Sequence, residues 1–321
     1  MVAIVRPSGD SQSFSMTGLT PGTGARSAPT HKRHSARHDP DGQQLAVELP
    51  DGRVLAARRW EGTGTPIVAL HGLFDCSLGW KHFAAATKRP CVAFDLPGFG
   101  RSGMPAETRF GSYADDILHG LDSLDMQSFS LVGHSLGGAV AAELSERARG
   151  RTLNLTLLAP AGFGSVPVAE MLAGSPLGRI VRLGVPLALS NPVSAAGIYM
   201  AVVSHGHPPE RQLLGRVIRR AFTTAPGAIA ANKAVVAAAR DPDGFVHRNV
   251  RYDGPVSALW GANDILMPAS HGTRLCEALP QAKLTVWEGM GHHPQRERPQ
   301  QLNEYLAGTT RVSEKRMLRA A

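Results

Sequence analysis

The chain has 321 residues, of which 43% are hydrophobic, so it is long enough to bury one large core or a core with a smaller attached unit. Its 34 lysine and arginine residues exceed its 26 aspartate and glutamate residues, which gives a formal net charge of +8. The excess lies in residues 1–42, 162–250 and 308–321, and no stripe of interleaved basic and aromatic residues occurs, which argues against nucleic-acid binding.

The three cysteines, Cys76, Cys91 and Cys276, are odd in number and far apart in the sequence. This usage is typical of small apolar side chains in a reducing compartment, and no Cys/His spacing indicates zinc, so we expect no metal. No apolar core of a signal peptide precedes Pro40, and no uninterrupted run of about 18 apolar residues occurs. We therefore expect a cytoplasmic protein without stable membrane insertion.

Residues 1–42 are rich in Ser, Thr, Gly, Pro, Arg and His and poor in large apolar side chains, which predicts a disordered N-terminal tail. The cluster His31-Lys32-Arg33-His34 in this segment, with His38, is interpreted as solvated chain rather than as a metal or anion site. At the other end of the chain, residues 308–321 are predicted to form a basic C-terminal tail.

Residues 43–161 and 251–307 alternate short apolar runs with amphipathic segments, and this pattern predicts the core. We expect eight strands, at Gln44–Leu49, Val54–Trp60, Pro66–Leu70, Cys91–Phe94, Phe129–Val132, Leu153–Leu158, Pro255–Trp260 and Lys283–Trp287. Helices are expected at Leu78–Thr87, Ser112–Leu124 and Leu136–Arg149. Continuous apolar strands separated by amphipathic helices predict an α/β fold with a mostly parallel sheet, covered by helices on both faces.

Residues 162–250 interrupt this alternation with helical pieces that are broken by prolines and contain no convincing strand. Ligands bind at the carboxyl ends of the strands in open parallel sheets, so we expect this insertion to cover the site as a helical cap. One piece of it places Leu213 and Val217 on a single apolar face. We expect these two side chains to line a substrate pocket together with Phe74 and His134.

The stretch Gly133-His134-Ser135-Leu136-Gly137 lies between an apolar strand and an Ala-rich run that favours helix. Gly-x-Ser-x-Gly on such a turn lifts the serine hydroxyl above the sheet and requires a strained backbone geometry. Ser135 is therefore the candidate nucleophile. The motif alone also fits an ordinary glycine-rich turn, so its weight depends on the residues that follow it in chain order.

An aspartate and a histidine follow the serine, each just beyond a predicted strand. Asp264 comes after the strand Pro255–Trp260, and His292 comes after the strand Lys283–Trp287. The three side chains can converge because the carboxyl ends of parallel strands meet at one edge of the sheet. A serine hydroxyl needs an adjacent base, for which His292 is the candidate, and Asp264 would fix the tautomer of that imidazole.

The oxyanion of such a reaction needs main-chain amides, and those of Leu73 and Leu136 are the candidates. Leu73 follows the strand Pro66–Leu70 closely, and Leu136 directly follows the nucleophile. Asp95 also ends a predicted strand. We interpret Asp95 as a residue that organises its loop by accepting hydrogen bonds from backbone amides, rather than as the catalytic acid.

These motifs resemble those of the α/β-hydrolase fold family, and the resemblance spans roughly Leu45–Ala307. The matching stretches are His71-Gly72, Asp95–Ser102, Gly133–Gly138, Trp260–Asp264 and Gly291-His292. The resemblance implies an eight-stranded, mostly parallel sheet with a helical cap, and no cofactor. The resemblance also favours His292 over His293, because the histidine of the family directly follows a glycine. Dehalogenases and epoxide hydrolases are disfavoured, since they have an aspartate where this chain has Ser135.

The sequence thus predicts a serine hydrolase that cleaves a carboxylic ester or thioester of a small to medium, largely apolar substrate through an acyl-enzyme. Hydrolysis of a carbon–carbon bond and acyl transfer are open alternatives on the same three residues. A non-catalytic small-molecule receptor or accessory protein with this fold is the alternative from another class. A small apolar molecule is the expected partner, and the pattern does not define an oligomeric state.

Overall fold

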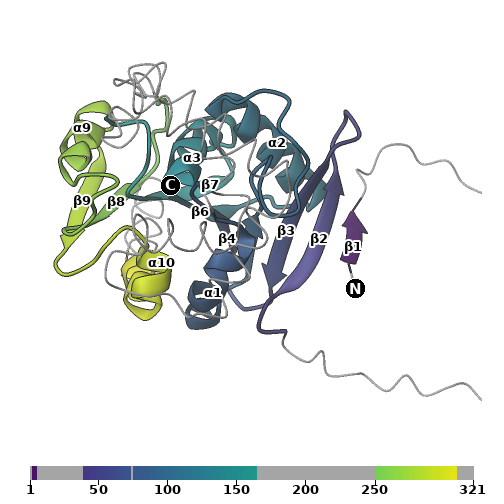
Figure 1. The fold of residues 1–321 in the computed structure, drawn as a ribbon, viewed down its shortest axis with the longest axis horizontal. Coiled ribbons are helices and arrows are strands. Elements are labelled where there is room, and N and C mark those ends of the chain that lie inside the picture. Colours follow the sequence, from purple (N-terminus) through teal and green to yellow (C-terminus); the bar gives the residue numbers. More distant parts are fainter. Residues whose placement is uncertain (1, 6–38, 74, 165–249, 309–321) are drawn as a thin grey trace, which may run out of the picture.

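A computed structural model describes residues 2–5, 39–73, 75–164 and 250–308 and arranges them around one sheet (Figure 1). The sheet has nine strands in the order β1-β2-β3-β5-β4-β6-β7-β8-β9. The strands are β1 Val2–Val5, β2 Gln43–Glu48, β3 Val54–Trp60, β4 Ile67–Leu70, β5 Cys91–Phe94, β6 Phe129–His134, β7 Thr152–Leu158, β8 Val256–Gly261 and β9 Ala282–Trp287. The eight predicted strands correspond to β2 through β9, and the predicted fold class is confirmed.

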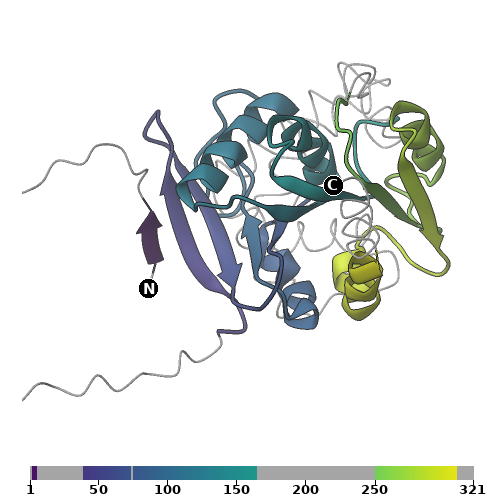
Figure 2. The same ribbon diagram turned by 180° about the vertical axis from the view of Figure 1, so that it is seen from behind.

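The sheet is mostly parallel because β5, β4, β6, β7, β8 and β9 all run in one direction. Strand β3 is antiparallel to both of its neighbours, β2 and β5. All residues of β4, β5 and β6 are buried, as expected for central strands that are covered on both faces. Figure 2 shows β1, β2 and β3 at one edge of the sheet and β9 at the opposite edge.

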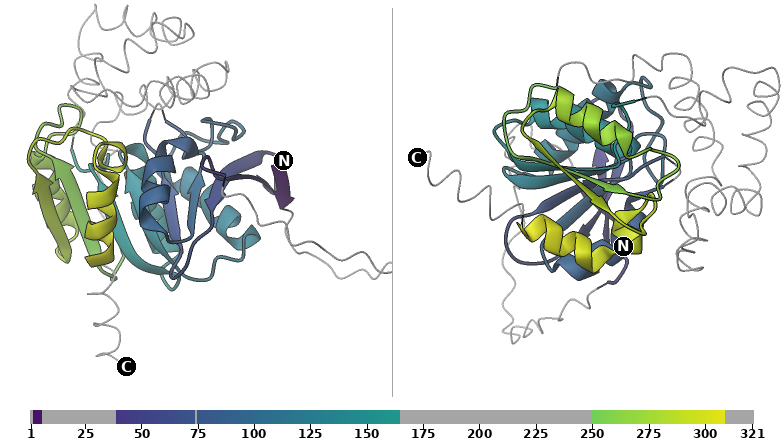
Figure 3. Two further views of the ribbon diagram at one scale, coloured as in Figure 1. Left: turned by 90° about the horizontal axis from the view of Figure 1, so that it is seen from below. Right: turned by 90° about the vertical axis from the view of Figure 1, so that its left-hand side faces the viewer.

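Helices cover both faces of the sheet (Figure 3). The helical elements are the 3-10 helix η1 Ser77–Trp80, α1 Lys81–Thr87, α2 Phe110–Ser123, α3 Leu136–Arg147, α9 Ser270–Ala278, α10 Pro294–Glu297 and a last helix over residues 299–308. Side chains of α2, α3 and α9 belong to the core on one face of the sheet. The core on the other face contains side chains of η1, α1 and the helix 299–308. The predicted helix Leu78–Thr87 is therefore a short 3-10 helix followed by α1.

The prediction of a disordered tail over residues 1–42 is wrong at both ends of that segment. Val2–Val5 form β1, which pairs in parallel with β2, and four consecutive apolar residues, three of them β-branched, favour a strand. Pro40 and Asp41 contact the core, since their carbonyl oxygens accept hydrogen bonds from Trp60 Nε1 at 3.3 Å and Arg58 Nη1 at 2.7 Å. The basic cluster around His31 lies outside the described residues.

The predicted cap, residues 162–250, falls almost entirely outside the described residues, and so does the predicted basic tail from residue 309 onward. Within the described ranges, each helix is too short or too polar to cross a bilayer.

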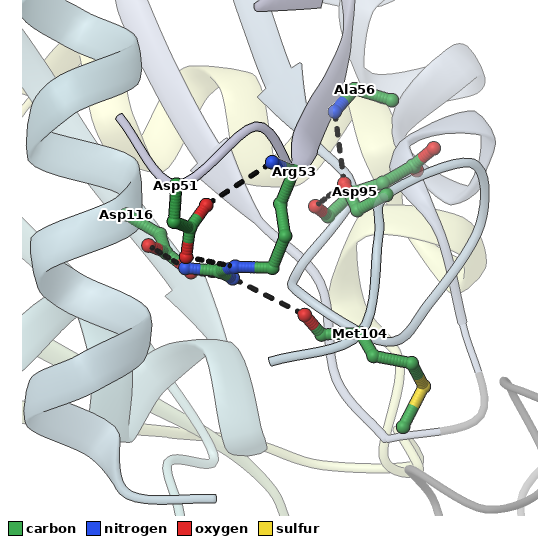
Figure 4. A network of polar contacts seen from close by, with 7 residues as sticks. Asp51, Arg53, Ala56, Asp95, Met104 and Asp116 are labelled. Atoms are coloured by element: carbon green, nitrogen blue, oxygen red, sulfur yellow. Dashed lines mark hydrogen bonds and ion pairs between the residues drawn. The ribbon is translucent and has the colours of Figure 1, made fainter. Parts of the chain in front are cut away.

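Arg53 ties the hairpin of β2 and β3 to α2 (Figure 4). Its Nη1 and Nη2 atoms donate to the two carboxylate oxygens of Asp116 at 2.7 and 2.8 Å, and its Nε atom donates to Asp51 at 2.6 Å. The hydrogen bond to Asp116 is the main reason why the pKa of Arg53 lies above its ordinary value. Nη1 also donates to the carbonyl oxygen of Met104 at 3.2 Å, which attaches the middle of the loop after β5 to this hairpin.

The start of the same loop is fixed by a serine. Ser102 Oγ donates to the carbonyl oxygen of Asp95 at 2.5 Å and accepts a hydrogen bond from the amide of Ala56 at 2.9 Å. Residues 95–104 of the loop after β5 are thereby held against the hairpin of β2 and β3. This loop lies at the carboxyl edge of the sheet, where the candidate site is built.

Candidate active site

Ser135 lies between β6 and α3 with φ 52° and ψ −118°, a left-handed backbone conformation that is strained for a residue with a side chain. The surrounding main chain fixes this conformation. The amide of Ser135 donates to Leu158 O at 2.9 Å, and its carbonyl oxygen accepts hydrogen bonds from the amides of Gly138 and Ala161 at 2.9 and 3.0 Å. Ser135 as a whole is 8% exposed and therefore buried.

Gly133 makes this sharp turn sterically possible. A Cβ atom at this position would lie 2.3 Å from the carbonyl oxygen of Gly137 in the first turn of α3, and 2.6 Å from the Cβ atom of Ala141. Strand and helix can approach this closely only because position 133 has no side chain.

Asp264 and His292 are in direct contact. His292 Nδ1 donates a hydrogen bond to Asp264 Oδ2 at 2.6 Å, and the two residues are 5% and 7% exposed. The other carboxylate oxygen, Asp264 Oδ1, accepts hydrogen bonds from the amides of Leu266 and Met267, each at 2.9 Å. These bonds fix the carboxylate. Because His292 Nδ1 donates to Asp264, Nε2 is the ring nitrogen that can accept a proton.

The loops that carry these two residues pack closely. A Cβ atom on Gly261, the last residue of β8, would lie 2.3 Å from the carbonyl oxygen of Met290 in the His292 loop. The amide of Asn263 donates to the same carbonyl oxygen at 2.9 Å. Close packing of the β8 and β9 loops therefore sets the contact between the carboxylate and the imidazole.

The loop of His292 also packs against the serine turn. The ring of His134, the residue before Ser135, lies 4.6 Å from the ring of His292 and 4.7 Å from the ring of His293, measured between centroids. His134 Nε2 is hydrogen-bonded to the carbonyl oxygen of His292 at 2.7 Å. Of the four side chains expected to line a pocket, only His134 lies in the described residues, and it is 1% exposed.

The loop after β4 also lies next to the serine. A Cβ atom on Gly72 would lie 3.0 Å from the Cβ atom of Ser135, so the peptide that leads to Leu73 passes next to the serine. His71 braces this loop, because its Nδ1 is bonded to Gly72 O at 2.8 Å and its Nε2 accepts from the amide of Leu96 at 2.9 Å. Leu136 begins α3, where helix amides and the helix dipole favour negative charge.

The carboxylate of Asp95 is occupied by main-chain amides. Its Oδ1 accepts from the amide of Ser77 at 2.6 Å, and its Oδ2 accepts from the amide of Arg101 at 2.9 Å. The His292 loop is supported by three charged residues that no sequence motif indicates, namely Asp75, Arg296 and Glu297. Within the described residues, no group of three or more His, Cys, Asp or Glu side chains has an arrangement suited to a metal ion.

Comparison with known families and relatives gives consistent matches. The model of the alpha/beta hydrolase family matches residues 67–305. The chain is 31% identical over 265 residues to the dihydrolipoyllysine-residue acetyltransferase component of the acetoin cleaving system of Pseudomonas putida, an alignment that covers 79% of this chain and 66% of that protein. It therefore spans slightly less than two thirds of the length of this relative. Rat 1-acylglycerol-3-phosphate O-acyltransferase ABHD5 (Rattus norvegicus) is 29% identical over 271 residues, 75% of each chain.

Solved structures with the same fold include two lipid or ester hydrolases. A membrane phospholipase A described as a bacterial virulence factor superposes with a TM-score of 0.68 at 22% identity and covers 86% of this chain and 87% of its own. A thermophilic esterase from Thermogutta terrifontis superposes with a TM-score of 0.67 at 21% identity, over 85% of this chain and 99% of its own. At this level of identity the likeness concerns the fold.

Proposed function

The chain belongs to the alpha/beta hydrolase family, and we propose that it is a serine hydrolase that cleaves a carboxylic ester or thioester of a small to medium, largely apolar substrate. The observation that carries this proposal is the 2.6 Å hydrogen bond between His292 Nδ1 and Asp264 Oδ2, combined with a serine in a strained strand-to-helix turn whose preceding residue, His134, contacts His292. The fixed aspartate holds the imidazole with its Nε2 lone pair free to act as a base.

The proposed reaction proceeds through an acyl-enzyme. Ser135 Oγ attacks the substrate carbonyl carbon while His292 Nε2 takes the proton of the serine hydroxyl. The proton then passes from His292 to the leaving group. The amides of Leu73 and Leu136 stabilise the oxyanion that forms on the carbonyl oxygen. A water molecule, deprotonated by His292, cleaves the acyl-serine bond and regenerates the enzyme. The position of Gly72 beside Ser135 supports this use of the Leu73 amide.

Acyl transfer is a second candidate, because two of the relatives are named as an acetyltransferase and an acyltransferase. The first half of the reaction is the same. In the second half, an alcohol or thiol attacks the acyl-serine in place of water, and His292 deprotonates that acceptor.

Labelling with a fluorophosphonate probe tests the nucleophile. We expect covalent labelling of the wild type and no labelling of Ser135→Ala, together with a loss of ester turnover of roughly 10⁴- to 10⁶-fold while the fold stays intact. Turnover by purified Ser135→Ala within about tenfold of wild type would exclude the assignment and favour a receptor or accessory role. A series of esters with increasing acyl length, with and without added alcohol or thiol, then separates hydrolysis from acyl transfer by the products formed.

Substitution of the two aspartates tests the acid. Asp264→Asn is expected to lower turnover by roughly 10⁴-fold because the wrong histidine tautomer is favoured. Asp95→Asn is the matched control, since its carboxylate binds the amides of Ser77 and Arg101, and it should act mainly on stability. Equal losses of turnover in two folded variants, checked by circular dichroism, would contradict the assignment of Asp264.

A further inference from the structure

The main chain around His292 is held by side chains outside the proposed triad. Glu297 in α10 accepts a hydrogen bond from the amide of Gly291 through Oε2 at 2.8 Å, and one from the amide of His293 through Oε1 at 2.9 Å. A single carboxylate thus holds the amides on both sides of His292. The carbonyl oxygen of His292 is held by a third side chain, that of His134.

The bond from His134 has a defined polarity. A carbonyl oxygen only accepts hydrogen bonds, so His134 Nε2 carries the proton and donates it to His292 O at 2.7 Å. His134 Nδ1 is buried and has no hydrogen-bond partner among the described residues. A Cβ atom on Gly72 would lie 2.9 Å from this nitrogen, which means that the unprotonated edge of the ring faces the loop that leads to Leu73.

The surroundings of His134 keep its imidazole neutral. Burial is the main cause that holds the pKa of His134 well below its ordinary value, and repulsion by a charged His292, His293 or Arg296 adds to it. Neutrality matters for the proposed reaction because His292 becomes an imidazolium in the transition state. A second cation at a ring separation of 4.6 Å would repel that charge and oppose proton transfer from the serine.

We propose that His134 is a positioning residue, which holds the carbonyl of His292 through a neutral imidazole protonated on Nε2. This inference rests on the proposed serine hydrolase function. The ring of His292 is bonded to Asp264, its carbonyl oxygen is bonded to His134, and the amides of its neighbours Gly291 and His293 are bonded to Glu297. Together these bonds fix the imidazole. His134 directly precedes Ser135 in the chain, so the same bond also ties the base to the nucleophile.

A matched pair of variants at this position tests the proposal. Glutamine and methionine have similar length and volume, but only the glutamine amide can place an N–H group near the site of His134 Nε2. We expect His134→Met to lower kcat by roughly 100-fold with little change in KM, and His134→Gln to recover most of this loss, because a misplaced base affects the chemical step more than binding. The rate of fluorophosphonate labelling should follow kcat in the same order.

Four outcomes would overturn the proposal. Equal kcat values in the two folded variants would show that the hydrogen bond has no role in positioning. A loss confined to KM would assign His134 to substrate binding instead. Nitrogen-15 NMR of the wild type with labelled histidines needs no variant. It therefore tests the protonation of the His134 ring even if His134→Met does not fold. A proton on His134 Nδ1, or protonation of the ring near the ordinary histidine pKa, contradicts the proposed state.

The same experiments separate this inference from the proposed function. If the wild type does not react with the fluorophosphonate, the serine hydrolase assignment fails. If the wild type reacts at Ser135 but His134→Met and His134→Gln both react at the wild-type rate, the hydrolase assignment stands and only the role of His134 is refuted.

Discussion

Asp75 and Arg296 form a buried ion pair, although 221 positions separate them in the chain. Their side chains are 1% and 5% exposed, and Asp75 Oδ1 also accepts a hydrogen bond from the amide of Cys76 at 2.7 Å. Asp75 lies in the loop that follows Gly72 and Leu73, and Arg296 lies in α10, just after His292. The pair therefore joins the candidate oxyanion loop to the loop of the candidate base.

Removal of one charge from this pair should destabilise the protein more than removal of both. Arg296→Met leaves the Asp75 carboxylate buried without its cation, and we expect a loss of about 3–5 kcal/mol in the free energy of unfolding. Adding Asp75→Leu removes the stranded charge and should restore part of this loss. Urea denaturation of the two single variants and the double variant measures the coupling, and additive effects would show that the two side chains do not interact.

Gly72 offers a test of the space beside the serine. A Cβ atom there would lie 2.9 Å from His134 Nδ1 and 3.0 Å from the Cβ atom of Ser135, so Gly72→Ala must displace the loop that leads to Leu73. We expect kcat to fall by roughly 100-fold, because oxyanion donors act only when they are placed correctly. Gly150→Ala is the control, since a Cβ atom at Gly150 meets no other atom within 4 Å. A Gly72→Ala enzyme with kcat equal to that of the control would exclude the Leu73 amide as an oxyanion donor.

Local sequence pattern predicted much of this fold. The apolar runs IVAL, CVAF and VSALW are buried on both sides and therefore contain few polar residues, which made β4, β5 and β8 recognisable. The order of Ser135, Asp264 and His292 was also visible, because each follows a strand and the carboxyl ends of parallel strands share one edge. Pattern could thus identify the candidate residues before their contacts were known.

The contacts that support the site could not be predicted in the same way. Glu297 lies in a polar stretch whose charges resemble those of an ordinary exposed helix, and only the fold brings its carboxylate to the amides of Gly291 and His293. The pairing of Asp75 with Arg296 depends on a loop and a helix that are far apart in the sequence and are brought together by the fold. Strand β1 is not recognisable from composition, because its four apolar residues lie within a segment whose overall composition is that of disordered chain.

Truncation of the N-terminal segment should have an effect that depends on where it stops. A chain that begins at residue 39 keeps the carbonyl oxygen of Asp41, which accepts a hydrogen bond from the buried Arg58 at 2.7 Å, whereas a chain that begins at residue 43 loses it. The chain that begins at residue 43 also loses the ion pair between Asp41 and Lys81 at 2.9 Å. We expect the shorter chain to be less stable by about 1.5–3 kcal/mol in urea denaturation, because the lost hydrogen bond involves a buried charged group.

Arg58→Met in both truncated chains is the control for that comparison. Without the guanidinium group, the two chains should differ by much less than 1.5 kcal/mol, the lower bound of the range for a hydrogen bond to a charged group. An unchanged difference would indicate that residues 39–42 stabilise the core through other contacts, such as the one between Pro40 and Trp60.

His134 should make the stability of the protein depend on pH below the ordinary histidine pKa. Burial lowers the pKa of His134 in the folded protein, so as the pH falls below about 6.5 the unfolded chain binds a proton that the folded chain does not. The contribution of His134 to stability is therefore fully present above that pH and decreases as the pH falls toward the lowered folded pKa. The slope is at most about 1.4 kcal/mol per pH unit for one group.

The variants His134→Gln and His134→Met lack this titration and serve as references. The free energy of unfolding of the wild type minus that of either variant should be constant from pH 7.5 to 8.5. Below pH 6.5 this difference should decrease. A difference that stays constant across the whole range, measured by urea denaturation, would show that His134 is protonated equally in both states, and a neutral imidazole beside His292 would then be excluded.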